Sequence, residues 1–211
     1  MQKPNSIFKQ TANWRNLRLY QKSDTLYQLT VAFCRRFLPV HGDRTVDQMV
    51  QAARSGKQNI VEGSEDGKTS TEMELKLLNV ARASIWELRE DYEDYLKSHN
   101  LEKWNNQHPR FGAMLDFCKE NNDYESYSAM VERLSEEEFC NMAITVCHFT
   151  DKMLVSYLDY LGKRFVTEGG IKERMHSART DYRKEQDLKM HALEQENQRL
   201  KGLLIQHGIP F

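Results

Sequence analysis

Residues 70–98 read STEMELKLLNVARASIWELREDYEDYLKS, and this stretch decides the fold class. Its apolar side chains recur every three or four residues, which is the period of an amphipathic α-helix. Thr69 as N-cap, with Glu72 three residues later, gives a capping box at its start. At 1.5 Å per residue, the prediction is one helix of about 40 Å. Its predicted apolar stripe is Met73, Leu77, Val80, Ser84, Leu88, Tyr92 and Tyr95, widened by Leu78, Ile85 and Leu96.

Three further amphipathic helices are predicted around this stretch, over residues 23–38, 44–61 and 135–165. Ser23 or Asp24 can cap the first helix, and Pro39 with Gly42 ends it. Ser135 followed by Glu138 gives the last helix a capping box. The chain is therefore predicted to be all-α, with a four-helix bundle over residues 23–168. The apolar stripe of residues 135–165 is Phe139, Met142, Ala143, Val146, Phe149, Met153, Tyr157 and Leu161.

Three segments lie outside the predicted bundle helices. Residues 1–22 form an N-terminal arm, in which Trp14, Leu17, Leu19 and Tyr20 pack as a lead-in strand or arm. Residues 100–134 form an insertion with short helices over 110–119 and 124–134, the first with Pro109 at its start. Residues 169–211 form a C-terminal suffix that begins at the break Gly169-Gly170.

The composition supports helices and excludes several functional classes. Hydrophobic residues make up 39% and charged residues 29%, which suits amphipathic helices with solvated outer faces. Only 10 Gly and 4 Pro are present, too few for the turns of an all-β fold. With 30 basic and 31 acidic residues, the net charge is −1. A chain this balanced is not a general polyanion binder.

Cysteine usage and the N-terminus indicate the compartment. Cys34, Cys118, Cys140 and Cys147 include no CxxC pair, which favours buried thiols in a reducing compartment over a metal site or disulfides. The N-terminus lacks the apolar segment of a signal peptide, and no run of about 18 apolar residues could span a membrane. We therefore expect a cytoplasmic protein.

No reaction is indicated. A di-metal four-helix bundle needs Glu-x-x-His pairs, which the sequence lacks. No nucleophile elbow supports Ser or Cys catalysis, and residues 63–67, GSEDG, lack the Gly-Lys-Ser/Thr ending of a phosphate loop. We expect a non-catalytic protein without a metal or a cofactor.

Polar residues in the stretch 51–63, QAARSGKQNIVEG, form the most distinctive group. Ser55, Asn59 and Glu62 are spaced i, i+4 and i+7 and share a helix face, with Arg54 at its edge. One interpretation is a buried polar network in which Asn59 and Glu62 bond to a neighbouring helix or hold the following turn. The other is a ligand or subunit contact. Gly56 indicates a close helix crossing, and Gly63 with Gly67 marks the turn that follows.

The stretch 51–63 resembles the signature of the bacterial four-helix bundle family first associated with intervening sequences in 23S ribosomal RNA genes. The matching residues are Arg54-Ser55, Asn59-Ile60 and Glu62-Gly63, followed by Ala81, Ala83-Ser84 and Glu87-Leu88. The suffix motif EGGIKERM at 168–175 resembles the four helix bundle suffix subgroup. The family is similar to the accessory protein of diversity-generating retroelements. The resemblance implies an antiparallel up-and-down topology, a homopentamer, and RNA and a reverse transcriptase as partners.

Two basic groups are candidate nucleic-acid-binding sites, in competition with solvated helix faces held by i,i+4 ion pairs. The first group joins residues from three predicted helices, and the second follows the bundle. Their members are Arg35, Arg36, Arg54, Lys57 and Arg82 for the first, and Lys163, Arg164, Lys172, Arg174, Arg179, Arg183 and Lys184 for the second.

The suffix carries a short heptad pattern. Met190, Asn197 and Leu204 fall at a, and Leu193 and Leu200 at d. Asn at a is typical of a parallel dimer with fixed register. The alternatives are a helix that packs back on its own bundle or frays.

Two functional hypotheses follow from these features. One is an oligomeric RNA- or DNA-binding accessory protein, which is what the resemblance implies. The other is a protein-interaction scaffold that assembles through the bundle and recruits a partner through its C-terminal helix.

Overall fold

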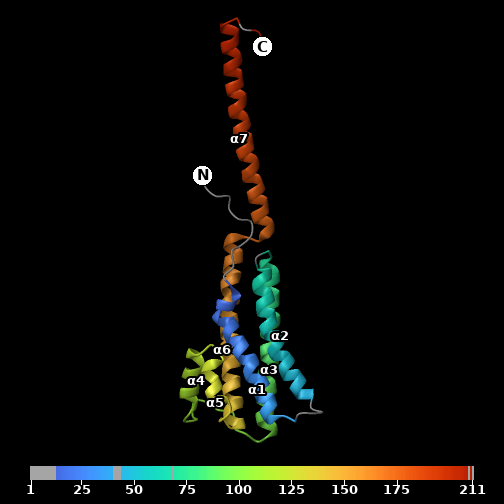
Figure 1. Ribbon diagram of the computed structural model, residues 1–211, viewed down its shortest axis with the longest axis vertical. Coiled ribbons are helices and arrows are strands. Elements are labelled where there is room, and N and C mark those ends of the chain that lie inside the picture. Colours follow the sequence, from blue (N-terminus) through green and yellow to red (C-terminus); the bar gives the residue numbers. More distant parts are fainter. Residues whose placement is uncertain (1–12, 40–43, 68, 209, 211) are drawn as a thin grey trace. The chain divides into compact units, whose positions relative to one another are not determined.

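The computed structural model of the protein describes residues 13–39, 44–67, 69–208 and 210. Over these residues the chain is helical and contains no β-strand, which confirms the all-α prediction. The chain divides into two units: residues 9–167, here called the body, and a second unit that contains residues 168–211. The elements (Figure 1) are η1 (Trp14–Asn16), α1 (Arg18–Phe37), α2 (Arg44–Asp66), α3 (Thr71–Ser98), α4 (Phe111–Glu120), α5 (Glu125–Val131), α6 (Glu136–Glu168) and α7 (Ile171–Gln206).

The helix predicted from residues 70–98 is present as α3, with two differences in detail. Ser70 rather than Thr69 is the N-cap, since its hydroxyl accepts a hydrogen bond of 3.1 Å from the Met73 amide. Met73 is 42% exposed and Val80 43%, so the predicted stripe is displaced around the helix. The buried stripe keeps the predicted Ser84, Leu88, Tyr92 and Tyr95 and adds Ala81, which lies toward α2. Its members are Leu78, Ala81, Ser84, Ile85, Leu88, Tyr92, Tyr95 and Leu96.

Helix α1 begins at Arg18, five residues before the predicted start. The predicted caps are wrong, because Ser23 lies inside the helix and its hydroxyl donates to the Tyr20 carbonyl at 2.8 Å. The end of the predicted N-terminal arm is therefore the first turn of α1, where Leu19 is buried. Residues 1–12 of that arm, and Gly42, lie outside the described residues.

Helix α2 continues through Gly63 to Asp66, so the turn predicted at Gly63 is wrong. Gly56 and Gly63 both face α3 at close range. A Cβ on Gly56 would lie 3.0 Å from Ile85 Cγ1, and one on Gly63 would lie 3.4 Å from the Glu74 carbonyl oxygen. The close crossing predicted from Gly56 is confirmed, and Gly63 extends it.

The core of the body is built around Phe33 of α1. Its ring lies 5.0 Å from that of Tyr92 and 4.9 Å from that of Tyr95 on α3, and 5.5 Å from that of Phe139 on α6. The Tyr92 hydroxyl, fully buried, donates to Thr30 Oγ1 at 3.1 Å, so its polar atom is satisfied. These contacts hold α1, α3 and α6 together (Figure 1). All four cysteines are buried, namely Cys34, Cys118, Cys140 and Cys147.

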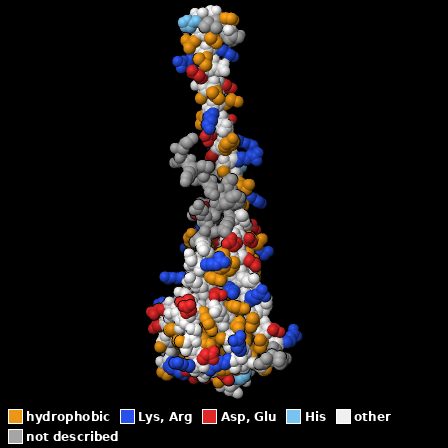
Figure 2. Space-filling view, in the orientation of Figure 1, with side chains coloured by type: hydrophobic (Ala, Val, Ile, Leu, Met, Phe, Trp, Pro, Cys, Tyr) orange, Lys and Arg blue, Asp and Glu red, His pale blue; other side chains and the backbone are white. Residues whose placement is uncertain are grey.

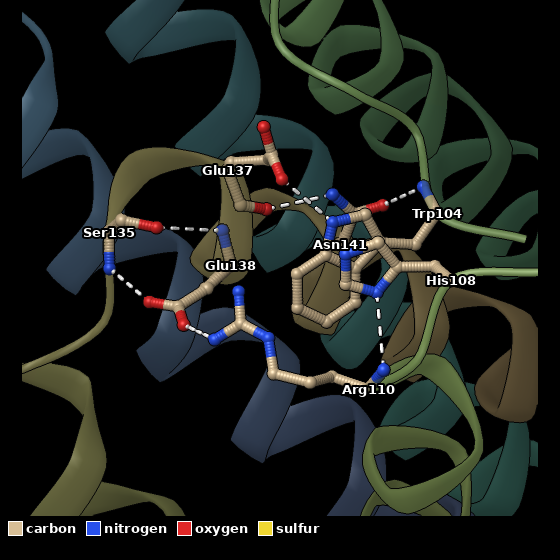
Figure 3. A network of polar contacts seen from close by, with 7 residues as sticks. All are labelled: Trp104, His108, Arg110, Ser135, Glu137, Glu138 and Asn141. Atoms are coloured by element: carbon tan, nitrogen blue, oxygen red, sulfur yellow. Dashed lines mark hydrogen bonds and ion pairs between the residues drawn. The ribbon is translucent and has the colours of Figure 1, made fainter.

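The segment between α3 and α4 is fixed to the first turns of α6 (Figure 3). The Trp104 amide donates to Asn141 Oδ1 at 2.7 Å, and its indole N–H donates to Glu137 Oε1 at 2.8 Å. The Trp104 ring stacks on His108 at 3.9 Å. The Arg110 guanidinium binds the Glu138 carboxylate.

Glu138 also closes the capping box predicted with Ser135. Its carboxylate accepts from the Ser135 amide at 2.7 Å, and its own amide donates to the Ser135 hydroxyl at 3.3 Å. The Ser135 amide, followed by the Ser135 hydroxyl and Arg110, lowers the pKa of Glu138. The start of α6 is therefore well specified and serves as the anchor for residues 104–110.

A buried lysine of α1 holds the other end of this region. The Lys22 ammonium group donates to the carbonyl oxygens of Cys118 and Asn121, where α4 ends. Thr25 donates to the Asn122 carbonyl at 2.9 Å, and the Tyr127 hydroxyl donates to that of Asn121 at 3.0 Å. Burial lowers the pKa of Lys22 to about 8. The carbonyls that α4 leaves without helical partners are thus satisfied from α1.

Candidate interaction surfaces

The polar group predicted on α2 divides into a network and two exposed residues. The hydroxyls of Ser55 and Ser84 lie 2.9 Å apart across the α2–α3 crossing. The Asn59 amide group donates to the carbonyl of Ser55 at 2.9 Å and to its hydroxyl at 3.2 Å. Arg54 and Glu62 are exposed, outside this network. A network of Ser55 and Asn59 is therefore present, but Glu62 does not complete it.

An open groove borders this network between α2 and α3. Arg44 and Arg54 line it from α2, and Glu87 and Asp91 line it from α3. Burial, followed by the negative charges of Asp94 and Glu87, raises the pKa of Asp91. A groove lined by both signs of charge does not concentrate the positive field that phosphate binding needs.

The side chains of the first predicted basic group do not converge on one surface, because they contact several different helices. Lys57 pairs with Asp24 of α1 at 3.1 Å. Arg82 pairs with Asp151 of α6 at 2.6 Å. Arg36 donates to the Val131 carbonyl at the end of α5. Three of the five side chains thus face three different helices. Of the other two, Arg35 is exposed on α1 and Arg54 lines the groove.

The described part of the second unit consists mainly of one long helix, α7. α7 begins after Gly169, which has a φ of +70°, and runs over 36 residues with none of them buried. The Gly170 amide donates to the Glu173 carboxylate at 3.0 Å and fixes the first turn. The helix is about 50 Å long at 1.5 Å per residue.

Part of the second basic group is aligned on α7. Lys172, Arg179 and Arg183 are separated by seven and four residues, so they share one face, and all three are exposed. Arg174 is half-buried, with its Nε 3.4 Å from the Gly170 carbonyl oxygen. Lys184 is also exposed but points about 100° away from its neighbour Arg183. The group's other members, Lys163 and Arg164, belong to α6.

The heptad positions of α7 expose large apolar side chains. Met190 is 61% exposed, Leu193 66% and Leu200 51%. Asn197 is exposed and Leu204 is half-buried. Hydrophobic side chains are visible at the surface along this helix (Figure 2). An ordered row of such side chains rarely stays exposed to water unless another surface covers it.

Charged residues beside this row were not among the predicted site residues. They are exposed, and in the same register they fall at g and e, the positions that border an a/d seam. The register therefore contained the signal that would have found them. These residues are Lys189 and Glu196 at g, and Glu194 and Lys201 at e.

Among the described residues, no group of three or more His, Cys, Asp or Glu side chains is arranged to hold a metal ion. Over the same part of the chain, no helix combines the length and the apolar character needed to cross a membrane.

Comparisons with family models, with curated proteins and with solved structures found no match to this chain. The resemblance carried by residues 51–63 and 168–175 therefore stays a prediction.

Proposed function

We propose that the protein is a non-catalytic scaffold that recruits its partner, either a second copy of the chain or another protein, through α7. The observation that carries this proposal is the row of exposed apolar side chains at Met190, Leu193 and Leu200. Burying one such side chain fully contributes about 1.5–3 kcal/mol, so a partner that covers the row gains a large share of its binding free energy there.

The proposal extends to the arrangement of the body. In it, α1, α2, α3 and α6 form an antiparallel up-and-down four-helix bundle, and residues 100–134 are an insertion. Two facts support this topology. Short connections join α1 to α2 and α2 to α3, which favours antiparallel neighbours. All four helices also contribute buried residues to one core.

Truncation tests the scaffold proposal. A chain without residues 185–211 should have a lower mass by light scattering than the full chain, and should capture less of any bound protein. A matched control replaces two polar residues of the same segment, His191→Ala and Gln198→Ala, which lie at b and away from the seam. Unchanged mass and unchanged capture after truncation would refute the proposal.

A second candidate function is RNA or DNA binding, with a reverse transcriptase as the protein partner suggested by the resemblance. The specific observation in its favour is the alignment of Lys172, Arg179 and Arg183 on one exposed face of α7. An oligomer would bring several copies of this face together, which compensates for a net charge of only −1 per chain.

Salt dependence tests this second candidate. Binding of single-stranded RNA should weaken steeply as salt rises, because phosphate contacts release counterions. The double variant Arg179→Ala with Arg183→Ala should bind RNA more weakly, and its affinity should depend less steeply on salt concentration. The control Lys184→Ala with Arg199→Ala removes the same charge from other faces of α7 and should lose less. An immeasurable response at about 50 mM salt would exclude this function.

A further inference from the structure

We propose that α7 pairs with α7 of a second copy of this chain, as a parallel, in-register, two-stranded coiled coil over residues 190–204. This inference rests on the proposed scaffold function and names the partner of its association surface. The chemical class of that partner is an identical helix, and three independent features of α7 select it.

The first feature is the seam. Met190, Leu193, Leu200 and Leu204 recur at intervals of three, seven and four residues, which keeps them on one face of a helix that turns about 100° per residue. Paired a and d positions remove such side chains from water by knobs-into-holes packing. Leu193 and Leu200 occupy d, the position that Leu fills in two-stranded parallel coiled coils.

The second feature is Asn197 at the centre of the seam. In a parallel, in-register pair, position a faces a, so the two Asn197 amides meet and can hydrogen-bond to each other. In an antiparallel pair, a faces d, so Asn197 would lie against Leu193 or Leu200 of the other helix. A buried amide without a partner is costly, which disfavours that arrangement.

The third feature is charge. In a parallel dimer, a g residue lies beside the e residue five positions later on the other helix. Lys189 then faces Glu194, and Glu196 faces Lys201. Both pairs are attractive, and twofold symmetry repeats each of them. Within one chain, Lys189 is 2.7 Å from Glu185 and Glu196 is 3.3 Å from Arg199, so these charges are ordered along the helix beforehand.

The seam also has a defined beginning. Continued toward the N-terminus, the register places His176 and Arg183 at a, and Arg179 and Gln186 at d. Cationic side chains at these positions repel across a parallel dimer. The paired region therefore starts at Met190, and the register cannot slide by a heptad toward the N-terminus without placing Met190 opposite Arg183.

Cross-linking tests the geometry directly. The full chain with Asn197→Cys should form a covalent dimer under mild oxidation, because the two a positions face each other. The matched control, Gln195→Cys, lies at f on the outer face and should stay monomeric on a denaturing gel. The four native thiols are buried and do not compete while the chain is folded. No dimer for Asn197→Cys, or equal dimer for both variants, would overturn the proposal.

Charge reversal tests the pairing. Lys189→Glu should weaken dimerisation by about tenfold at low salt, since two attractive pairs become repulsive. Lys189→Glu combined with Glu194→Lys should restore most of the loss. Sedimentation equilibrium measures the dimer dissociation constants of the single and the double variant. Failure of the second change to rescue the first would overturn the assigned register.

The scaffold function and this inference can fail separately. If removal of residues 185–211 abolishes capture of a different protein while Asn197→Cys gives no dimer, the scaffold function stands and the α7 pairing is wrong. If truncation changes neither mass nor capture, both are wrong.

Discussion

Gly56 of α2 and Ile85 of α3 are so close that a Cβ on the glycine would lie 3.0 Å from Ile85 Cγ1. The Ser55–Ser84 hydrogen bond of 2.9 Å lies one residue away on each helix. The missing side chain at Gly56 and the position of the Ile85 side chain therefore set the distance between α2 and α3 at this level. The hydrogen bond between Ser55 and Ser84 depends on that distance.

A larger side chain at Gly56 should separate α2 from α3. We expect Gly56→Val to lower the free energy of unfolding by about 1–3 kcal/mol, the usual cost of overpacking. Urea denaturation of the full chain measures it. The control is Gly162→Ala, since a Cβ there meets nothing within 4 Å. This change should leave stability equal or raise it by up to about 1 kcal/mol. Equal behaviour of the two variants would contradict the close crossing.

Removing the ammonium group of Lys22 should destabilise the body. Lys22→Met keeps the apolar stem but leaves the carbonyls of Cys118 and Asn121 without their donor. We expect a loss of about 2 kcal/mol by urea denaturation, typical of buried polar groups that lose a partner. The exposed Lys97, paired with Asp94 at 2.9 Å, is the control, and Lys97→Met should leave stability almost unchanged because solvent screens an exposed ion pair. A Lys22→Met variant as stable as the native chain would show that these carbonyls find other donors.

Stability should fall as pH rises above 9. Burial raises the pKa of the Cys118 thiol from 9.0 to about 11, so the unfolded chain loses this proton first. Its stabilising contribution is complete below pH 9 and is lost as pH rises through 11. The pKa values of other buried or half-buried thiols and phenols are raised too and add to the loss. These groups are Cys140, Cys147, Tyr92, Tyr95, Tyr127 and Tyr157.

Urea denaturation between pH 8 and 11 measures how the free energy of unfolding falls with pH. In Cys118→Ala this fall over the interval should be smaller by about 2 kcal/mol. Lys22 acts in the opposite direction. Its folded pKa of about 8 lies below the ordinary 10.5, so its own contribution rises with pH across that window. In Lys22→Met the free energy of unfolding should therefore fall more steeply between pH 8 and 11. An identical slope in all three proteins would show that these groups keep ordinary pKa values in the fold.

Replacing Asn197 should change the specificity of α7 association. Asn197→Leu removes the polar pair from the seam, so we expect tighter association together with a loss of the single dimeric state. Light scattering across a concentration series should show species larger than a dimer. Gln195→Leu, on the outer face, should retain the mass of the native chain. An Asn197→Leu chain that associates less than the native one would contradict a seam position for this residue.

The helical elements were predictable because their signals are local. The capping box of Ser135 and Glu138 and the period of residues 70–98 need only neighbouring residues, and both are present. The exact position of the buried stripe of α3, which leaves Met73 and Val80 exposed, was not predictable in this way. It depends on Gly56, Ala81 and Ser84 meeting across a crossing, which is a property of two helices together.

Long-range polar contacts were missed for the same reason. Lys22 lies on the buried face between Leu19 and Leu26, which hints at burial, but its acceptors come from residues about 100 positions away. Trp104 and Asn141 are likewise brought together only by the fold. By contrast, the candidate surface on α7 was readable from the sequence, since a heptad register is set within one helix.

The hydrogen bonds of Lys22 to the region between α3 and α6 predict which residue relatives of this chain carry at that position. A relative that lacks residues 100–134 would have no carbonyl acceptors for an ammonium group at this position of its first helix. Lysine there and the additional segment should therefore be gained and lost together across relatives, with an apolar residue in the shorter chains. In an alignment of homologues, the residue at the position of Lys22 would then identify the chains that contain the segment equivalent to residues 100–134.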